Sequence, residues 1–175
     1  TARSLPLNKE ITMNAPVQPF ETLLETPFFD VIKRGKYFIV KEEHEVNAAV
    51  ILARNTQGQY LLVDHYRGAI DQDSLELPRG GRKPNETLLE TAKRELLEET
   101  GYASESWALL GKVHTNTSLI GSSVEVYLAV DAVQVTTDTD GETKGTKTFT
   151  GEELKALIRG GKITDSHTLS AWAML

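Results

Sequence analysis

Short apolar segments alternate with turn residues through the middle of the chain. The apolar runs at residues 45–53 and 59–66 flank a polar turn at residues 55–58, an arrangement that is typical of a β-hairpin. A strand-like run at residues 37–40 precedes them, and residues 75–77 alternate before a proline. The pattern as a whole predicts strands at residues 37–40, 45–53, 59–66, 75–77, 107–114 and 124–131.

A helical period is strongest in the segment Glu86–Thr100. Asn85 precedes this segment and is a favoured N-cap residue, while Gly101 follows it, as expected at the position after a helix. The remaining C-terminal elements are expected to be a long polar loop and two helices, at residues 136–148, 152–159 and 165–175. Because no internal repeat or linker separates two cores, we expect a single α/β fold with a mixed sheet.

The N-terminal part of the chain differs from the rest. Residues 1–19 contain three prolines and little periodicity, so an irregular arm is expected there. Residues 20–40 are rich in apolar side chains and end in the strand-like run. We therefore expect an N-terminal arm and strand segment at residues 1–40 and a main domain at residues 41–175.

Composition and charge narrow the classes of function. The 175 residues carry 19 Lys and Arg against 25 Asp and Glu, a formal net charge of −6, which disfavours a nucleic-acid partner because such proteins neutralise phosphates with basic residues. The lack of cysteine excludes disulfides, thiol nucleophiles and sulfur-ligated zinc. No apolar run is long enough to span a membrane, and the first twenty residues lack the apolar core of a signal peptide, so a cytoplasmic protein without a membrane partner is expected.

Three glutamates of the central helix, Glu95, Glu98 and Glu99, share one face because they are spaced three and four residues apart. The apolar stripe of this helix consists of Leu88, Leu89, Ala92 and Leu96. The solvent side is marked by Glu90, Lys93 and Arg94. The three acids therefore overlap the edge of the buried stripe instead of lying opposite it.

This clustering of like charges is unfavourable without a cation. Each like-charged pair at this spacing costs about 0.2–0.5 kcal/mol, and the helix dipole disfavours anions in the last turn. A solvated acidic face of an ordinary amphipathic helix is the alternative explanation. Carboxylates without a paired-histidine motif favour a hard divalent cation, Mg²⁺ or Mn²⁺. The four scattered histidines are expected to be surface or hydrogen-bonded residues; they are His44, His65, His114 and His167.

The same segment resembles a known sequence motif. Gly80, Glu86 and the run Arg94–Tyr102 (RELLEETGY) are similar to the Nudix box, GX5EX7REUXEEXGU, in which U is an aliphatic residue. Every fixed position matches at the correct spacing, and the one departure is Tyr102 at an aliphatic position. The resemblance implies the Nudix fold, an α/β/α sandwich here preceded by a β arm, and hydrolysis of a nucleoside diphosphate linked to another moiety.

The resemblance also implies roles for individual residues. Glu95, Glu98 and Glu99 would bind the metal together with the backbone carbonyl of Arg79, and Arg94 would orient a catalytic glutamate, for which Glu98 is the candidate. Glu86 lies nine residues before Glu95, on the opposite side of a continuous helix, and so joins the site only if the chain is still a loop there.

Similarity outside the box narrows the expected substrate. Residues 64–67, 75–80 and 161–169 resemble the corresponding stretches of ADP-ribose pyrophosphatases, although the proline that these enzymes carry after the box is missing from residues 117–121. The candidate substrate-binding residues are Arg67, Glu76 and Arg79. Arg67 is expected to bind a substrate phosphate, with a surface ion pair as the alternative. Glu76 is expected either to accept a hydrogen bond from the adenine or ribose of the substrate or to form an ion pair with an arginine.

The residue that takes a proton from water is the least determined. Glu142, in the polar loop, is the candidate general base by similarity to ADP-ribose pyrophosphatases. The competing acids are Asp138, Asp140 and Glu125. Tyr66, Trp107 and Tyr127 are candidates for stacking on a base, but core packing is the favoured interpretation for each of them.

Two kinds of function remain open. The first is a Mg²⁺-dependent diphosphatase that acts on ADP-ribose or an ADP-sugar, or on other nucleoside diphosphate derivatives such as NADH and dinucleoside polyphosphates. The second is a regulatory module that binds such a nucleotide without cleaving it. The retained Glu95, Glu98 and Glu99 favour the enzyme. In the resembling family the N-terminal segment pairs with a second subunit, so a homodimer is expected, with strand pairing inside one chain as the alternative.

Overall fold

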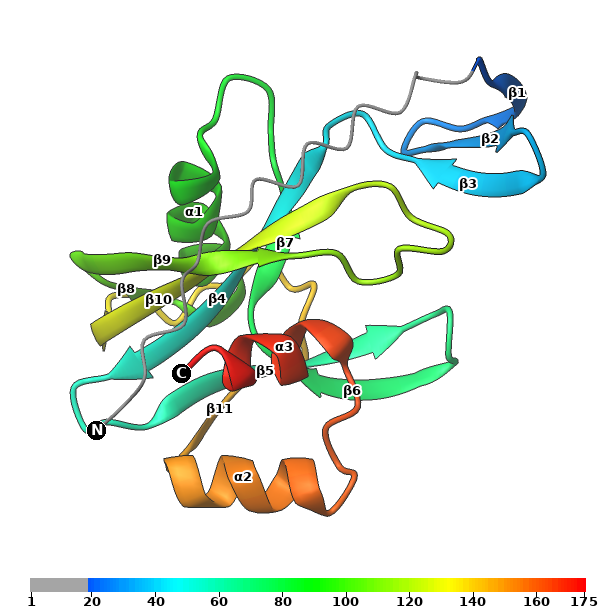
Figure 1. Cartoon of the computed structure of the whole chain (residues 1–175). Coiled ribbons are helices and arrows are strands. Elements are labelled where there is room, and N and C mark those ends of the chain that lie inside the picture. The colour runs from blue at the N-terminus through cyan, green and yellow to red at the C-terminus, as the bar shows by residue number, and fades with distance from the viewer. Residues whose placement is uncertain (1–18) are drawn as a thin grey trace, which may run out of the picture.

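The computed structural model of the protein describes residues 19–175 (Figure 1). The irregular arm expected at residues 1–19 therefore lies almost entirely outside the described residues. Within them the chain forms a three-stranded sheet and a branched eight-stranded sheet. The small sheet consists of β1 (Glu21–Glu25), β2 (Asp30–Arg34) and β3 (Tyr37–Lys41), which pair antiparallel in chain order.

The large sheet is organised around β4 (Val46–Asn55). This strand pairs in parallel with β10 (Ser123–Gln134) and antiparallel with β7 (Arg79–Gly81). At its far end β4 meets β5 (Tyr60–Arg67) across the predicted turn. The remaining strands are β6 (Gln72–Glu76) and β11 (Thr146–Phe149), which pair with β5, and β8 (Tyr102–Ala103) and β9 (Ser106–Val113), which pair with β10. The sheet is mixed, as expected.

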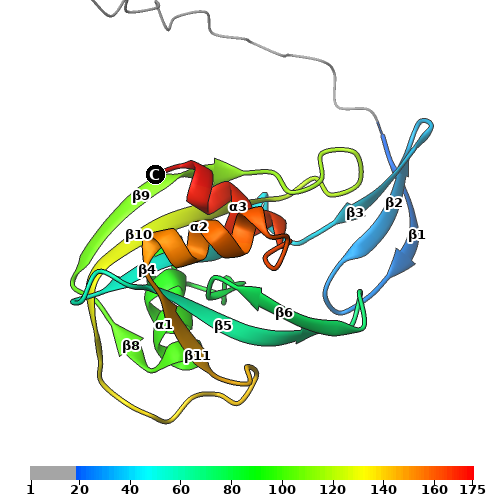
Figure 2. The ribbon, with the colours of Figure 1, turned by 90° about the horizontal axis from the view of Figure 1, so that it is seen from below.

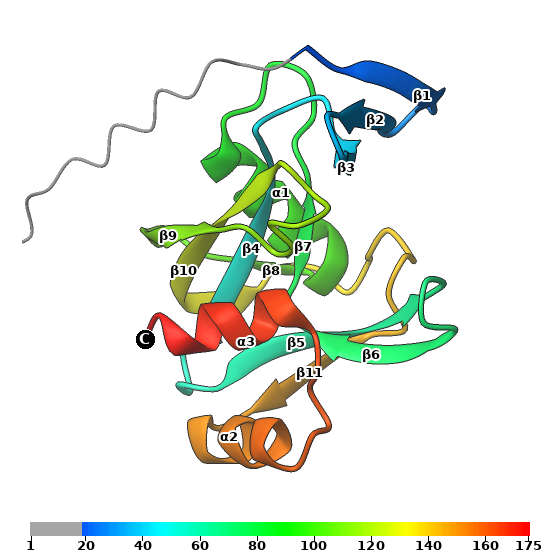
Figure 3. The same cartoon turned by 45° about the vertical axis from the view of Figure 1, so that its right-hand side comes forward.

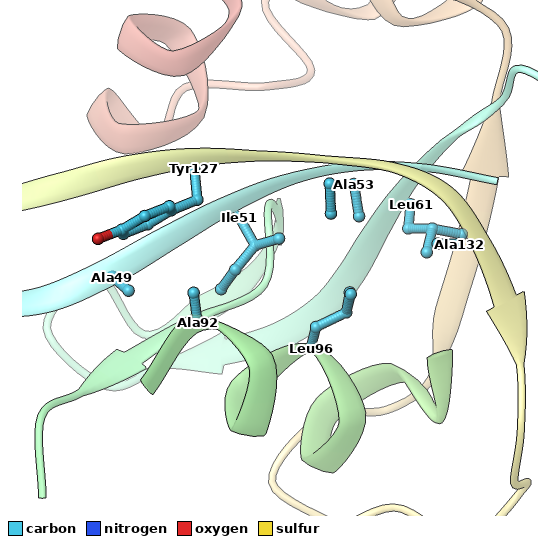
Figure 4. Close-up of a cluster of buried hydrophobic side chains, with 9 residues drawn as sticks. Ala49, Ile51, Ala53, Leu61, Ala92, Leu96, Tyr127 and Ala132 are labelled. Atoms are coloured by element: carbon cyan, nitrogen blue, oxygen red, sulfur yellow. The ribbon is translucent and has the colours of Figure 1, made fainter. Parts of the chain in front are cut away.

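Helices cover both faces of this sheet. Successive residues of β4 point to opposite faces, so Ile51 packs with Ala92 and Leu96 of α1 (Leu88–Thr100), whereas Leu52 packs on the other face. Figure 4 shows the first of these clusters, with α1 below the strands. The other face is covered by α2 (Gly151–Arg159) and α3 (Ser166–Ala173). The predicted α/β/α sandwich is therefore confirmed.

The start of α1 differs from the sequence prediction. The N-cap is Thr87, not Asn85, and the helix begins at Leu88. The Thr87 hydroxyl accepts a hydrogen bond from the Glu90 amide, and the Glu90 carboxylate accepts one from the Thr87 amide. This reciprocal pair needs a Glu or Gln three residues after the cap, and the residue three positions after Asn85 is Leu88. Asn85 instead has a left-handed backbone, with φ of 67°. The predicted end is correct, because Gly101 adopts φ of 73° after the last turn.

Three short strands of the large sheet were not predicted. The strands β7, β8 and β11 have two to four residues each and little apolar alternation, and they are strands because their backbones pair with longer neighbours. As a result, the Gly80-Gly81 pair lies in a strand, and the predicted loop at residues 136–148 ends where β11 begins at Thr146.

The small sheet stands apart from the main body (Figure 2). It is joined to the body where the Val40 amide donates a hydrogen bond to the Leu119 carbonyl at 2.8 Å. Large apolar side chains of this sheet and its flanking turns are exposed, most of all Phe28 at 84%. The strands pair within one chain, which was the alternative to pairing with a second subunit. Among residues 19–175, no helix is both long and apolar enough to cross a membrane.

Candidate active site

Arg94 lies at the centre of the acidic face of α1. Its Nη1 atom is 2.5 Å from Glu95 Oε1 and 2.8 Å from Glu98 Oε2, and its Nη2 atom donates to the Gly81 carbonyl at 2.9 Å. The side chain is only 17% exposed. The assignment of Arg94 to the solvent side was therefore wrong, because its long side chain folds along the helix toward the carboxylates.

Glu86 joins this group because α1 starts at Leu88, which leaves Glu86 in the preceding loop. Its Oε1 atom is 2.8 Å from Arg94 Nε, and its Oε2 atom also accepts from the hydroxyl of Thr91. The hydrogen bond from Arg94 lowers the pKa of Glu86 to about 2. The condition that the sequence set for Glu86, a loop conformation, is thus fulfilled.

Glu99 is the most buried acid of the helix, at 3% exposure. One carboxylate oxygen accepts a hydrogen bond from the Arg79 amide at 3.0 Å, and no side-chain cation of residues 19–175 forms an ion pair with it. Burial raises the pKa of Glu99 to about 8. Burial also raises the pKa of Glu95, although Arg94 opposes this effect.

Gly80 of β7 is packed directly against Glu95. A Cβ atom at this position would overlap the Glu95 carboxylate, whereas one at Gly81 would meet nothing within 4 Å. Only glycine therefore lets the helix carboxylate approach the β7 backbone this closely. The first glycine of the sequence motif thus has a steric role in this structure.

The charges of this region suit a divalent cation. We call Glu86, Glu95, Glu98 and Glu99 the acid cluster. When ionised these residues carry four negative charges, which Arg94 and Lys83 (Nζ to Glu98 Oε1, 3.5 Å) offset by two. Carboxylate oxygens are the ligands that Mg²⁺ and Mn²⁺ prefer. In residues 19–175 no three acids or histidines already converge as metal ligands, since Arg94 holds three members of the cluster.

A cavity of about 310 Å³ opens beside β7, and Gly80 and Gly81 form part of its wall. Arg67 and Arg79 also line it, and Glu76, which is 2% exposed, holds both. Glu76 Oε2 is 2.6 Å from Arg67 Nη2 and 2.8 Å from Arg79 Nη2. Burial opposes ionisation of Glu76, but the hydrogen bonds from Arg67 and the charge of Arg79 hold its pKa below the ordinary value. Glu76 thus pairs with arginines, one of its two predicted roles.

The start of α3 adds two residues that sequence reasoning did not place in the site. Asp165 caps α3 by accepting from the Thr168 amide at 2.8 Å, and its other oxygen is 3.4 Å from Arg79 Nη1. His167 Nδ1 also contacts Arg79 Nη1, and His167 lines the cavity. The N-cap pattern of residues 165–168 was the available signal, but it did not indicate that the cap faces an arginine 86 residues earlier.

The loop between β10 and β11 crosses the C-terminal end of α1 (Figure 3). The Asp140 amide donates to the Glu98 carbonyl at 3.0 Å, and the Thr143 hydroxyl donates to the Glu99 carbonyl at 3.3 Å. Glu142 lies in this loop, and its amide donates to Asp140 at 2.9 Å. The Glu142 side chain is exposed and, among the described residues, forms no hydrogen bond or ion pair with the acid cluster. Its assignment as general base stays a prediction.

The remaining candidates serve the core or the surface. Tyr127 is buried in the cluster against α1 (Figure 4), and its hydroxyl donates to Glu125 at 2.6 Å. Trp107 packs against the same cluster and donates to the Ser104 carbonyl at 2.7 Å. Tyr66 is half exposed and donates to Asp71. Core packing, the favoured interpretation, therefore holds for Tyr127 and Trp107.

Comparison with known sequences agrees with this geometry. The family model described as the NUDIX domain matches residues 43–170. The chain belongs to the Nudix family. Nudix proteins generally use a divalent metal ion such as Mg²⁺ and act on small nucleoside diphosphate derivatives.

Two curated proteins are similar to part of this Nudix chain. The ADP-ribose pyrophosphatase of Bacillus subtilis (strain 168) is 31% identical over 97 residues, which are 55% of this chain and 51% of that protein. The methanol dehydrogenase activator of Bacillus methanolicus is 29% identical over 82 residues, 47% of this chain and 44% of that protein. The chain thus matches about half the length of each relative.

Solved structures support the Nudix fold. A crystal structure described as an ADP compounds hydrolase superposes with a TM-score of 0.73 at 18% identity, covering 89% of each chain. A Nudix hydrolase from Nitrosomonas europaea superposes with a TM-score of 0.58 at 22% identity, covering 74% of this chain and 87% of that one. At these identities the likeness concerns the fold alone.

Proposed function

We propose that this Nudix protein hydrolyses the pyrophosphate bond of a nucleoside diphosphate linked to another moiety, with ADP-ribose or an ADP-sugar as substrate. Water adds to one phosphorus atom, the bond from that phosphorus to the bridging oxygen breaks, and the products are AMP and a sugar phosphate. The observation that carries this proposal is the position of Gly80, which touches the acid cluster and also lines the cavity that holds Arg67 and Arg79.

Glu95, Glu98 and Glu99, with the backbone carbonyl of Arg79, would hold Mg²⁺ or Mn²⁺. When bound, such an ion acts as a Lewis acid on phosphate oxygens and lowers the pKa of coordinated water. Arg94 would position two of these glutamates, Glu95 and Glu98. Since it contacts Glu95 and Glu98 at once, it fixes their separation and offsets part of their mutual repulsion.

The cavity arginines would bind the diphosphate. Arg67 makes a bidentate contact with the buried Glu76, and Arg79 makes a single contact with it. Both side chains are therefore already ordered, and little conformational entropy is lost when a phosphate binds. Asp165 and His167 hold Arg79 from the other side. Glu98 and Glu142 are the proposed catalytic carboxylates, and the loop that carries Glu142 is attached to α1 through Asp140 and Thr143.

We also propose that the active protein is a homodimer that associates through the small sheet. The apolar side chains exposed there belong to β1, β3 and the turn between β1 and β2; they include Leu24, Phe28, Tyr37 and Phe38. A surface of this kind is typical of a protein–protein contact.

A substrate panel tests the proposed activity. The protein is incubated with Mg²⁺ and, separately, with ADP-ribose, ADP-glucose, NADH, a diadenosine polyphosphate and dGTP, and AMP or phosphate release is measured. We expect the highest kcat/KM for ADP-ribose or ADP-glucose. Binding of ADP-ribose without turnover of any compound would overturn the proposal in favour of a nucleotide-binding module.

A further inference from the structure

The floor of the cavity is a row of small and aliphatic residues across three strands. Val124 of β10 lies opposite Ala48 of β4, and Ala48 lies opposite Gly81 of β7. Because β10 and β7 flank β4 on opposite sides, residues attached to these two strands reach the cavity from opposite ends. Arg79 belongs to the β7 side, whereas Ser122 directly precedes β10.

The two ends of the cavity present different charged groups. Arg67, Arg79 and His167 lie at the β7 end, and Glu42, from the connection between β3 and β4, lies at the β10 end. The buried hydroxyl of Ser122 donates a hydrogen bond to Glu42 Oε2. No ion pair to Glu42 forms within the described part of the chain. A substrate therefore meets at one end a carboxylate that has no ion-pair partner among the described residues. At the other end it meets the guanidinium groups of Arg67 and Arg79, whose charges Glu76 and Asp165 offset.

This separation determines how a diphosphate compound fits. Phosphate oxygens accept hydrogen bonds from the guanidinium N–H groups of the arginines and are repelled by Glu42, so the uncharged part of the substrate faces the Glu42 end. The polar groups there are Glu42, Asn47, Thr115 and Ser122. Carboxylate, amide and hydroxyl groups are suited to several hydroxyls at once, because they offer acceptors and donors at short range.

The size and lining of this end favour a sugar over a base. A volume of about 310 Å³ is at the lower limit of typical ligand pockets. The apolar residues of the lining are the aliphatic Ala48, Ile120 and Val124, and the lining contains no Phe, Tyr or Trp ring. Its one imidazole, that of His167, contacts Arg79 at the opposite end. The end that Glu42 closes is therefore matched to a polyhydroxyl group.

We propose that Glu42, held by Ser122, is a specificity-determining residue that accepts hydrogen bonds from hydroxyls of the sugar attached to the distal phosphate. This inference rests on the proposed function for its substrate class. Glu42 thereby selects nucleoside diphosphate sugars over diphosphates that lack the sugar.

The experiment compares two substrates that share the ADP group, ADP-ribose and the β-methyl ester of ADP, which lacks the second sugar. For Glu42→Ala we expect kcat/KM for ADP-ribose to fall roughly 10- to 100-fold, mainly through KM, the range expected for a lost hydrogen bond to a charged group. The kcat/KM of Glu42→Ala for the methyl ester should stay within about twofold of the wild-type value. Glu42→Gln keeps a hydrogen-bond acceptor, so its kcat/KM for ADP-ribose should fall less than that of Glu42→Ala.

Glu43→Ala is the matched control because Glu43 is the adjacent, exposed glutamate and does not line this cavity. Equal losses on both substrates, or none on either, would overturn the proposal. Binding of both compounds is also measured by calorimetry with wild type and Glu42→Ala in chelator. If no substrate is turned over but Glu42→Ala weakens only ADP-ribose binding, the proposed hydrolysis fails and the sugar site stands. If wild type binds neither compound, both proposals fail.

Discussion

The Arg79 amide donates a hydrogen bond to the carboxylate of Glu99 at 3.0 Å, although the two residues lie 20 positions apart. This bond joins β7, which lines the cavity, to the last turn of α1. It also leaves Glu99 buried with a backbone donor and no ion-pair partner within residues 19–175. The energetic cost of that arrangement makes the acid cluster testable without knowledge of the substrate.

Glu99→Gln should separate activity from stability. We expect kcat to fall by at least the roughly 10–100-fold that loss of a group supporting a metal site costs. In the metal-free protein at neutral pH the same change should raise the free energy of unfolding by roughly 1–3 kcal/mol. The uncharged amide avoids both the burial of a charge and the cost of protonating the carboxyl, while an acceptor for the Arg79 amide remains. Activity assays and urea denaturation in chelator measure the two effects. A destabilised metal-free variant would contradict the argument from repulsion and burial.

The metal-free protein should lose stability as pH rises. The pKa of Glu99 in the folded state is about 8, above its ordinary value of 4.5, so between these values the native state binds a proton that the unfolded state has released. The free energy of unfolding therefore decreases across this range. Saturating Mg²⁺ should reduce the slope, as should Glu99→Gln. Thermal denaturation at several pH values, with chelator or with Mg²⁺, measures how stability depends on pH. Equal slopes of stability against pH in all samples would contradict the prediction.

Gly80→Ala should be far more harmful than Gly81→Ala. An added methyl group at Gly80 overlaps the Glu95 carboxylate, while one at Gly81 enters open space. We expect Gly80→Ala to lower the free energy of unfolding by about 1–3 kcal/mol, the usual cost of overpacking, and to abolish most activity by displacing Glu95. Gly81→Ala is the control for loss of glycine in the same strand. Similar effects of the two substitutions would show that backbone freedom, not the contact with Glu95, matters.

Glu142→Gln tests the general base. If Glu142 takes the proton from water, kcat should fall roughly 10²–10⁴-fold while KM changes little, because substrate binding does not use this side chain. Asp138→Asn in the same loop tests a competing acid and should leave kcat unchanged if Glu142 is the base. Asp140→Asn would also be compared, since Asp140 is attached to α1 and its charge contributes to the raised pKa of Glu99. A larger loss for Asp140→Asn than for Glu142→Gln would reassign the base.

Phe28→Asp tests the proposed homodimer. Phe28 is 84% exposed in the turn between β1 and β2, so a charge there does not disturb packing within one chain. We expect wild type to elute as a dimer with a mass of about twice 19.3 kDa in light scattering, and the variant to shift toward the monomer. Val135→Asp, another exposed apolar position but on the main body, is the control. A monomeric wild type would contradict the proposal.

Local patterns predicted the features that depend on neighbouring residues. The shared face of Glu95, Glu98 and Glu99 follows from helical spacing, and the end of α1 follows from Gly101. The start of α1 was misplaced because both Asn85 and Thr87 are good caps, and the choice depends on the reciprocal bond with Glu90. The strand β7 could not be predicted from its glycines because it exists through pairing with β4.

Contacts between distant segments account for what the sequence left open. The sequence suggested separately that Arg67 and Glu76 belong to a site, but the pairing of Glu76 with both Arg67 and Arg79 depends on how β5, β6 and β7 are arranged. The contribution of α3 was missed because Asp165 and Arg79 meet only in the folded chain. The placement of Glu42 in the same cavity as Arg67 and Arg79 has the same origin.

The bond between Val40 and Leu119 has a mechanical consequence. Leu119 belongs to the same short connection as Thr115 and Ile120, which form part of the cavity wall at the proposed sugar position. A longer bond from the Gly121 amide to the Val40 carbonyl, at 3.5 Å, joins the same segments, so any restraint on the small N-terminal sheet is passed through Val40 to the rim of the pocket. How firmly two copies hold each other would set how freely that rim moves.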